Sequence, residues 1–197
     1  MITYLVTGAA GFVGSALVRL LVGGGDARVV SVDALTYAAD LERLRAAGDG
    51  PRHRFVKLDV NDQGAMLELL REERPAAVIH LAAETHVDRS IDGPRQFVVA
   101  NTLGTFNLLE AVRHYWLDLP ATGKQTFRLV NVSTDEVYGA LGPTGMFDED
   151  SPYDPRSPYS ASKAGADHFA AAYFHTFGLP VITTHASNNY GPFQFPE

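Results

Sequence analysis

The sequence predicts an α/β fold in which helices cover both faces of a parallel β-sheet, the arrangement called doubly wound. Three observations support this fold class. Short apolar segments with strand character occur six times, helical periodicity fills most of the gaps between them, and each gap is long enough to cross one face of a sheet. Strands that are buried on both faces have near-continuous apolar runs of this kind. We therefore expect six parallel strands, with a ligand over their carboxyl ends where the strand order reverses.

The individual elements follow in order from these patterns. The expected strands are centred on residues 4–6, 29–32, 55–58, 77–81, 129–132 and 181–183. The first helix is expected to bury a face made of Phe12, Val13, Ala16, Leu17, Leu20 and Leu21. A second helix is indicated by Met66, Leu67 and Leu70, and a third, over residues 107–116, by Phe106, Leu109, Glu110 and Arg113 beside Leu108 and Val112. A long surface loop rich in Gly, Pro, Asp and Glu is expected between Tyr138 and Tyr159, followed by a helix over residues 160–177.

Composition excludes several classes of protein. With 197 residues, 46% hydrophobic and 20% charged, the chain can bury a sizeable core, and we expect one large domain over residues 1–197. The net charge is −7 and no stretch concentrates basic residues, so neither nucleic acid nor an anionic membrane is an expected partner. There is no cysteine, no apparent signal peptide and no long apolar segment, so a cytoplasmic location is expected.

The seven histidines do not have the spacing of a metal site, and no metal is expected. His80 lies in an apolar strand and is expected to be a core histidine with satisfied hydrogen bonds. His86, followed by Asp88 and Arg89 in a strand-exit loop, is a candidate ligand contact.

Gly8, Gly11 and Gly14 form a G-x-x-G-x-x-G pattern between the first expected strand and the first expected helix. Gly8 permits a tight turn, Gly11 lets backbone amides approach a pyrophosphate, and Gly14 lets the helix pack closely on the strand. An ordinary glycine-rich turn is the alternative. Asp33 favours the binding site, because it ends the second strand 19 positions after Gly14, where a carboxylate accepts hydrogen bonds from a ribose diol. The pattern predicts a Rossmann-like, dinucleotide-binding fold.

The same region predicts which dinucleotide binds. Ala34 has no guanidinium to receive a 2′-phosphate, and the carboxylate of Asp33 would repel one. The expected cofactor is therefore NAD rather than NADP.

Tyr159 and Lys163 form a Tyr-x-x-x-Lys pair that places both side chains on one helix face. A lysine cation near the phenol, together with a positive nicotinamide ring, would lower the pKa of the tyrosine, so that the phenolate could take a hydroxyl proton as hydride leaves. The alternative is a solvated lysine beside a packing tyrosine. The position after the fifth strand favours catalysis.

The segment Ser133-Thr134-Asp135-Glu136-Val137-Tyr138 lies at the carboxyl end of the fifth strand. Two neighbouring carboxylates there could divide the roles of acid and base if their environments separate their pKa values. Thr134 could hydrogen-bond a substrate hydroxyl beside Tyr159. An idle, solvated acidic turn is the alternative, and the location favours the catalytic interpretation.

Taken together, these residues resemble the extended short-chain dehydrogenase/reductases. Three further strings, at residues 81–91 (LAAETHVDRSI), 133–139 (STDEVYG) and 187–192 (SNNYGP), narrow the resemblance to the dTDP-glucose 4,6-dehydratases within that family. The resemblance covers all 197 residues, and Thr134-Asp135-Glu136 is its most discriminating part. It also implies that most of the C-terminal substrate lobe of such enzymes is absent from this chain, which ends at the start of that lobe.

The resemblance implies a hydro-lyase reaction, the NAD-dependent conversion of dTDP-glucose to dTDP-4-keto-6-deoxyglucose. Tyr159, with Lys163 and Thr134, would deprotonate the 4-hydroxyl while NAD accepts the C4 hydride. Glu136 would remove the C5 proton, Asp135 would protonate the departing 6-hydroxyl, and the hydride would return to C6.

The resemblance also implies the binding residues and the assembly. The cofactor would contact Gly8, Gly11, Phe12, Val13, Gly14, Asp33, Leu35, Thr36, Asp59, Val60, Leu81, Ala82, Ala83, Tyr159, Lys163 and Asn189. The sugar nucleotide would contact Thr85, Thr134 and Asn188. Ala100 replaces a hydroxyl residue often found before Asn101, which removes one cofactor contact. A homodimer through a four-helix bundle is expected, because the helices over residues 107–116 and 160–177 carry surplus apolar surface, on Phe106, Tyr115, Trp116, Phe169, Tyr173 and Phe174.

Three other functions remain open at this stage. A UDP-glucose 4,6-dehydratase would share the Thr-Asp-Glu triplet, and another nucleotide-sugar epimerase or dehydratase would share most of the remaining motifs. A regulatory NAD-binding module that performs no catalysis is the alternative from a different class. The intact set of Thr134, Asp135, Glu136, Tyr159 and Lys163 argues against it.

Overall fold

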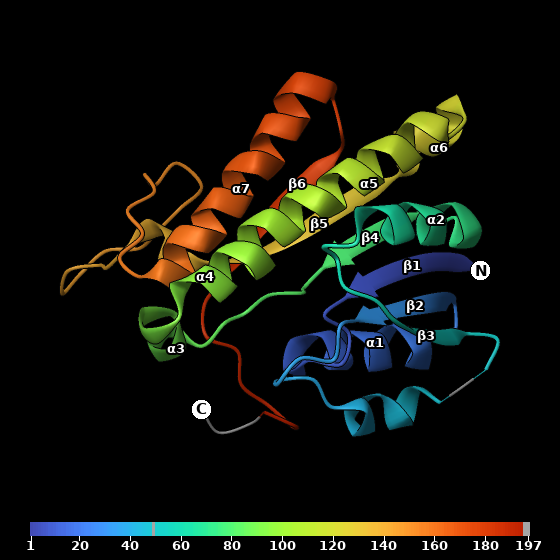
Figure 1. Cartoon of the computed structure of the whole chain (residues 1–197), viewed down its shortest axis with the longest axis horizontal. Helices are drawn as coiled ribbons and strands as arrows, with labels where there is room; N and C mark the ends of the chain where they lie inside the picture. Colours follow the sequence, from blue (N-terminus) through green and yellow to red (C-terminus); the bar gives the residue numbers. More distant parts are fainter. Residues whose placement is uncertain (49, 195–197) are drawn as a thin grey trace.

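The computed structural model describes residues 1–48 and 50–194, which form one six-stranded parallel sheet with helices on both faces (Figure 1). The strands are β1 Ile2–Thr7, β2 Ala27–Asp33, β3 His53–Lys57, β4 Ala77–His80, β5 Arg128–Thr134 and β6 Val181–Ala186. The helices are α1 Phe12–Gly23, η1 Leu41–Ala47, α2 Gln63–Glu73, α3 Val87–Asp92, α4 Pro94–Phe97, η2 Val98–Leu103, α5 Gly104–Asp118, α6 Ala121–Thr126, η3 Asp135–Tyr138 and α7 Pro158–Phe177. All six predicted strands and the doubly wound fold class are confirmed.

The strand order is β3-β2-β1-β4-β5-β6, so the order reverses between β1 and β4. In that central pair Thr7 lies opposite His80, and on its other side Thr7 lies opposite Val32. The carboxyl ends of β1, β2 and β4 therefore meet along one edge of the sheet. This edge is the predicted ligand position for a doubly wound sheet.

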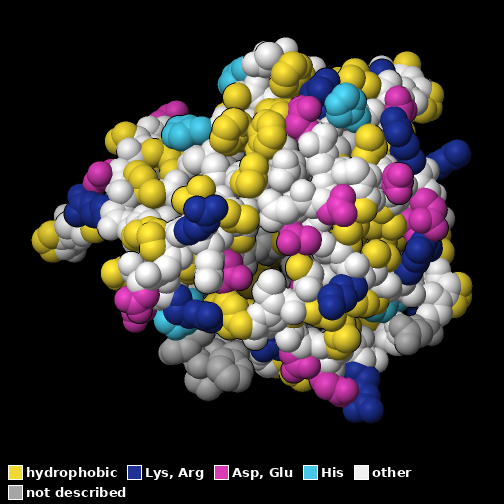
Figure 2. Space-filling view, in the orientation of Figure 1, with side chains coloured by type: hydrophobic (Ala, Val, Ile, Leu, Met, Phe, Trp, Pro, Cys, Tyr) yellow, Lys and Arg dark blue, Asp and Glu magenta, His cyan; other side chains and the backbone are white. Residues whose placement is uncertain are grey.

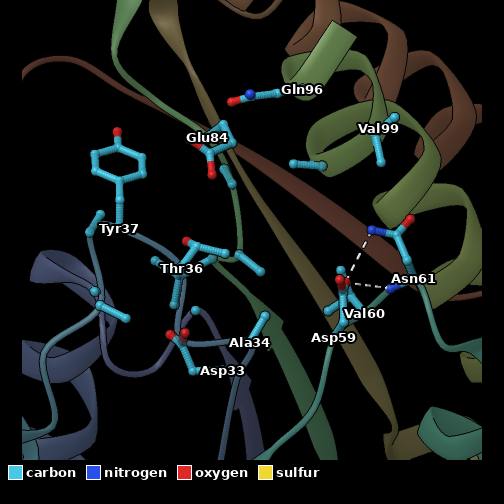
Figure 3. A pocket seen from close by; sticks show the side chains of 18 of the residues that line it. Asp33, Ala34, Thr36, Tyr37, Asp59, Val60, Asn61, Glu84, Gln96 and Val99 are labelled. Carbon is cyan, nitrogen blue, oxygen red and sulfur yellow. Dashed lines mark hydrogen bonds between the residues drawn. The ribbon is translucent and has the colours of Figure 1, made fainter. Parts of the chain in front are cut away.

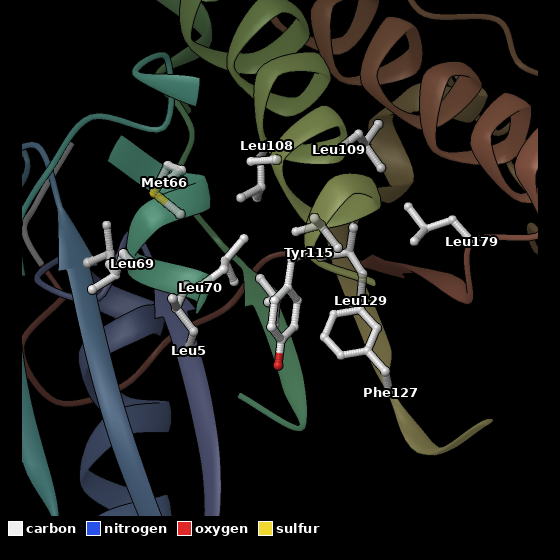
Figure 4. Close-up of a cluster of buried hydrophobic side chains, with 14 of the residues drawn as sticks. Leu5, Met66, Leu69, Leu70, Leu108, Leu109, Tyr115, Phe127, Leu129 and Leu179 are labelled. Carbon is white, nitrogen blue, oxygen red and sulfur yellow. The ribbon is translucent and has the colours of Figure 1, made fainter. Parts of the chain in front are cut away.

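One face of the sheet is covered by α2, α5 and α7, and it holds the larger apolar core (Figure 4). Strand residues such as Leu5 and Leu129 pack there against Met66, Leu70 and Leu108 from the helices, and all five are fully or almost fully buried. The third predicted helix, α5, packs against the rest of the protein on two sides. Leu108, Val112 and Tyr115 face the core, whereas Phe106 and Glu110 contact Tyr173 of α7.

The other face is covered by α1 and η1 over β1 and β2. The predicted buried face of α1 is confirmed only in part. Leu17 and Leu21 pack against the core, whereas Leu20 is 72% exposed and Val13 and Ala16 are also exposed. The buried residues are Gly14, Ser15, Val18 and Val22. Small residues let the start of the helix lie close against the turn after β1, and this contact fixes how α1 lies on the sheet.

A continuous helical segment, α4 through η2 to α5, runs from residue 94 to residue 118 and was predicted only in its last part. Its middle, η2, is a π-helical turn, a rare conformation that often occurs at functional sites. Asn101 in this turn is buried. The π-turn therefore directs a polar side chain inward beside the carboxyl edge of the sheet.

The long loop predicted after Tyr138 is present over residues 139–157, where the described chain forms no helix or strand. After β6 the chain leaves the sheet and passes near α1, where the guanidinium carbon of Arg19 lies 4.7 Å from the ring centroid of Phe193 (Figure 1). In the described part of the chain, no helix is both long and apolar enough to span a membrane.

Candidate functional site

A cavity of about 560 Å³ lies at the carboxyl edge of the sheet, where the strand order reverses (Figure 3). Figure 2 shows a hollow near the middle of the molecular surface in the same view as Figure 1. Nine residues expected to bind a cofactor line the cavity: Gly8, Gly11, Asp33, Thr36, Asp59, Val60, Leu81, Ala82 and Ala83. The segments that follow β1, β2, β3 and β4 therefore supply one wall of the cavity.

The glycine turn after β1 is shaped by close backbone contacts. Gly8 has a φ of +66°, and a Cβ there would lie 2.6 Å from the backbone of Leu81 and Ala82. A Cβ on Gly14 would lie 2.1 Å from the carbonyl oxygen of Gly8. No side chain caps the start of α1, whose first residue follows Gly11. The free amides at this helix end are suited to bind an anion such as a pyrophosphate.

Asp33 ends β2 and is 8% exposed. Its Oδ2 accepts from the amide of Ala10 at 2.9 Å, and its Oδ1 accepts from the amide of Leu35 at 2.8 Å. Each carboxylate oxygen has two lone-pair positions, so both oxygens keep a position for a hydroxyl donor. The two backbone contacts fix the carboxylate at the cavity wall, where Ala34 also lies.

Several other residues expected at the cofactor do not border this cavity: Phe12, Val13, Gly14, Leu35, Tyr159, Lys163 and Asn189. Leu35 adopts a positive φ of 59° and packs against the core beneath α1. Asn188 and Asn189 are exposed in the segment after β6, and Thr85 is exposed after β4. These positions therefore do not form the cavity wall.

The end of β5 brings two carboxylates to one turn. The strand ends at Thr134, and the next four residues form the short helix η3. The hydroxyl of Thr134 caps this helix by accepting from the amide of Glu136 at 3.2 Å. Because the backbone turns here, Asp135 and Glu136 do not alternate across a strand. Burial raises the pKa of the Glu136 carboxyl, and the neighbouring Asp135 raises it further.

Tyr159 and Lys163 lie one helical turn apart near the start of α7, where Ser157 and Ser160 form a capping box. Both side chains are buried, and Lys163 Nζ donates to the carbonyl oxygen of Val132 at 2.8 Å. The expected lowering of the tyrosine pKa is not found in the chain itself. Burial raises the pKa of Tyr159 to about 12, against an opposing hydrogen bond with Thr134. Positive charge from a bound cofactor would be needed to favour the phenolate.

Asn101 was missed as a site residue in the sequence. Its Oδ1 accepts from the amide of Glu84 at 2.8 Å, and its Nδ2 donates to the carbonyl oxygen of Glu84 at 2.9 Å and to Ser162 Oγ at 2.8 Å. It therefore joins the segment after β4 to α7. A single Asn in an apolar helix forms no recognisable sequence motif. The structural feature that marks Asn101 is its place in the π-helical turn.

The outer cavity wall was also not predicted. It includes Tyr37, Arg89, Arg95, Gln96 and Val99 (Figure 3). The guanidinium of Arg89 lies 3.7 Å from the ring centroid of Tyr37, a contact between α3 and the loop that follows β2. These residues come from segments far apart in the sequence, and only the arrangement of the strands brings them together.

His80 is a core residue, as predicted. Its Nδ1 lies 2.7 Å from Thr7 Oγ1 and its Nε2 lies 3.0 Å from Thr105 Oγ1. Burial lowers its pKa to about 3, and the nearby Lys163 contributes to this shift. His86 caps α3 through its ring nitrogen and is not part of the cavity wall. Within residues 1–48 and 50–194, no group of three His, Asp or Glu side chains is arranged to hold a metal ion.

A family model described as GDP-mannose 4,6 dehydratase matches residues 5–197. The chain belongs to this family. Among the curated relatives of the chain, a dTDP-glucose 4,6-dehydratase from Xanthomonas campestris pv. campestris is 55% identical over the whole chain, which covers 56% of that protein. The enzyme of the same name from Neisseria meningitidis serogroup B is 52% identical over 98% of the chain, which covers 55% of that protein.

Solved structures of related enzymes share the fold. The dTDP-glucose 4,6-dehydratase DesIV from Streptomyces venezuelae, with NAD bound, matches with a TM-score of 0.90 and 44% identity over 99% of this chain and 58% of its own. A UDP-glucose 4-epimerase from Thermus thermophilus, in complex with NAD, matches with a TM-score of 0.85 and 33% identity over 100% of this chain and 58% of its own. The chain thus spans little more than half the length of the family members it matches.

Proposed function

We propose that this chain is the NAD-binding and catalytic part of a dTDP-glucose 4,6-dehydratase. The observation that carries the proposal is the turn at the end of β5. It presents Thr134, Asp135 and Glu136 beside Tyr159, at the same carboxyl edge of the sheet as a cavity suited to a dinucleotide. The relatives named above support this substrate class. The reaction is an internal redox cycle, which requires an acid and a base at one sugar as well as a hydride carrier.

The residues of the cavity fit NAD. The uncapped start of α1 and the close-packed turn at Gly8 would receive the pyrophosphate, and Asp33 would receive the adenine ribose diol. Asp59, Val60 and Ala82 would line the dinucleotide. When bound, NAD supplies the redox chemistry by accepting hydride from C4 of the sugar and returning it to C6.

Tyr159 is proposed to take the proton of the 4-hydroxyl, with the hydroxyl of Thr134 orienting the phenol. The buried ammonium of Lys163 would stabilise the phenolate by its charge. Oxidation at C4 makes the C5 proton acidic, because the carbanion that would form is conjugated with the new ketone.

Glu136 is proposed to take the C5 proton, and Asp135 to give a proton to the departing 6-hydroxyl, which leaves as water. A carboxylate whose pKa is raised is the stronger base, and burial gives Glu136 this property. Glu136 then returns a proton to C5, which regenerates it as the base. Tyr159 loses to solvent the proton it took from the 4-hydroxyl and Asp135 regains one from solvent, so all three groups are ready for the next turnover.

The remaining assignments belong to the same proposal. Residues 1–197 form the dinucleotide-binding domain up to the start of the substrate lobe, and Thr85 and Asn188 face the sugar nucleotide. The protein is cytoplasmic and forms a homodimer through α5 and α7. Phe169 and Leu103 support the dimer, because they are 40% and 45% exposed on these elements and the adjoining η2. Hydrophobic side chains gather over α5 and α7 in Figure 2.

The test is turnover by the complete polypeptide with dTDP-glucose and with UDP-glucose. We expect the 4-keto-6-deoxy product, detected by its absorbance in alkali and by mass, to form faster from dTDP-glucose. Faster turnover of UDP-glucose would reassign the nucleotide. Epimerised sugar without loss of water would identify an epimerase, and the absence of any product with NAD bound would identify a binding module.

The cofactor preference is tested separately by titrating the protein with NAD and NADP. Asp33 receives a diol but repels a phosphate, so NAD is expected to bind at least tenfold more tightly. Equal affinities would contradict the role assigned to Asp33.

A further inference from the structure

Asp167 is a buried carboxylate for which the proposed reaction has no role. It lies on α7 four residues after Lys163 and eight after Tyr159, so all three side chains share one helix face. The side chain of Asp167 is only 1% exposed. A charge this deeply buried is costly unless other groups compensate it.

Four donors from three other parts of the chain meet this carboxylate. Oδ1 accepts from Asn131 Nδ2 at 2.9 Å, and Oδ2 accepts from Ser133 Oγ at 2.6 Å. Oδ2 also lies 3.3 Å from His185 Nε2 and accepts from the hydroxyl of Tyr153 at 3.4 Å. These contacts supply both buried carboxylate oxygens with hydrogen-bond partners.

The four donors connect Asp167 to the parts of the chain that carry the reaction. Asn131 and Ser133 belong to β5, which ends at Thr134. Tyr153 belongs to the loop that precedes Tyr159, and His185 belongs to β6. His185 Nδ1 in turn lies 3.1 Å from the hydroxyl of Tyr138, at the end of η3. One carboxylate therefore holds together the segments around the acid, the base and the phenol.

Lys163 is the one lysine or arginine of α7. It is 4% exposed, and its one described hydrogen bond goes to a neutral carbonyl of β5. Burial lowers the pKa of Lys163, and the negative charge of Asp167 opposes that effect. The other ionisable groups around the pair are His80 on β4, Tyr159 on α7, His185 on β6, and Tyr138 and Tyr153. Asp167 is the carboxylate that acts on Lys163 from the same helix.

We propose that Asp167 is a positioning residue that keeps the buried ammonium of Lys163 charged and fixes the end of β5 against α7. The proposal rests on the function proposed above, because the charge of Lys163 matters through its effect on Tyr159. Asp167 itself does not line the cavity.

The direct test is the titration of Lys163 by NMR of the complete polypeptide labelled with ¹³Cε-lysine. These 197 residues contain three lysines, Lys57, Lys124 and Lys163, and loss of a signal in Lys163→Arg assigns it. We expect D167N to lower the pKa of Lys163, because the opposing negative charge is lost. D167E, which keeps the charge, should retain a higher value than D167N. If D167N does not fold, Asp167→Ser is measured instead, with the same expectation.

An unchanged Lys163 pKa in D167N, or equal values in D167N and D167E, would overturn the proposal. This readout needs no turnover, so it separates failure of the positioning role from failure of the dehydratase assignment.

Turnover supplies the second readout. In D167N, kcat should fall about tenfold or more, whereas KM should change less than twofold. The alkaline limb of the pH profile of kcat should move to lower pH, because Lys163 then loses its proton at a lower pH. The matched control is Tyr153→Phe, which removes one donor but leaves the carboxylate charge, and its alkaline limb should stay in place. A decrease in D167N by the same factor at every pH would indicate a structural role and contradict the proposal.

Discussion

At the scale of single residues, the roles proposed for the adjacent carboxylates after β5 depend on a local turn. Neighbouring residues on an extended strand point to opposite faces, so two adjacent side chains cannot reach one substrate from a continuing strand. Here the strand ends at Thr134, whose hydroxyl starts η3. Asp135 and Glu136 therefore both lie beyond the sheet, in the region of Tyr159. Their separate roles can be tested one residue at a time.

Glu136→Gln should retain C4 oxidation but lose solvent exchange at C5, because the amide cannot take the proton. Asp135→Asn should slow the loss of water, because it cannot protonate the 6-hydroxyl. Each change should slow its own step by about a hundredfold or more. Deuterium incorporation at C5, measured beside the absorbance of reduced cofactor, distinguishes the steps. Exchange at the wild-type rate in Glu136→Gln would place the base elsewhere.

His80 gives a prediction for stability. Its pKa of about 3 in the folded chain lies below the ordinary value of 6.5, so the unfolded chain binds the proton more readily. The neutral imidazole contributes its full stability above pH 6.5. That contribution is lost as the pH falls toward 3, by about 1.4 kcal/mol for each pH unit. Urea unfolding between pH 7 and pH 5 should show a smaller loss in His80→Gln than in the wild type.

The matched control is Thr105→Val, which removes the hydrogen-bond partner of Nε2 but keeps the imidazole. It should lower stability at every pH while keeping most of the wild-type pH dependence. The same pH dependence in His80→Gln and in the wild type would show that His80 is not the group responsible.

At the scale of secondary-structure elements, the packing of α1 against the turn after β1 shapes the proposed cofactor site. Gly14→Ala would place a Cβ 2.1 Å from the Gly8 carbonyl oxygen, which must then move. We expect the free energy of unfolding to fall by about 3 kcal/mol, with loss of measurable NAD binding. Urea unfolding and cofactor titration measure the two effects.

Gly23→Ala is the control on the same helix, because a Cβ there meets nothing within 4 Å. Stability should stay the same or rise by up to about 1 kcal/mol, since alanine reduces the freedom of the unfolded chain. NAD affinity should not change. Equal losses in the two variants would show that glycine is needed for a reason other than close packing.

At the scale of the whole molecule, the exposed apolar surface of α5 and α7 differs from the surface predicted. Tyr115 and Tyr173 are buried in the core and are not available to a partner. Phe106 is half-buried against Phe169, at 5.6 Å between ring centroids. Exposed apolar area remains on Phe169, Phe174, Phe177 and Leu103. This remaining surface is the part that can support the proposed homodimer.

Phe169→Glu or Leu103→Glu should convert the dimer to a monomer, because an apolar contact would then have to bury a carboxylate. Sedimentation velocity of the complete polypeptide measures the change. Leu20→Glu, at a 72% exposed position on α1, is the control and should leave the assembly unchanged. A monomeric wild type at high concentration, or dimers in both test variants, would contradict this interface.

The sequence by itself determined the six strands, the parallel doubly wound sheet and the carboxyl edge as the place of the site. These features depend on local apolar periodicity and on glycine and acidic residues at fixed offsets, which act over short stretches of chain. The tertiary structure decided which part of the predicted α1 face is buried, because the close approach at Gly14 fixes how the helix lies on the sheet. It also decided the hydrogen bonds by which Asn101 joins the segment after β4 to α7, and those that surround the carboxylate of Asp167. The partners of Asn101 lie 17 to 61 residues away in the sequence, and those of Asp167 lie 14 to 36 residues away. No local pattern marks such contacts, because only the packing of strands against helices brings these residues together.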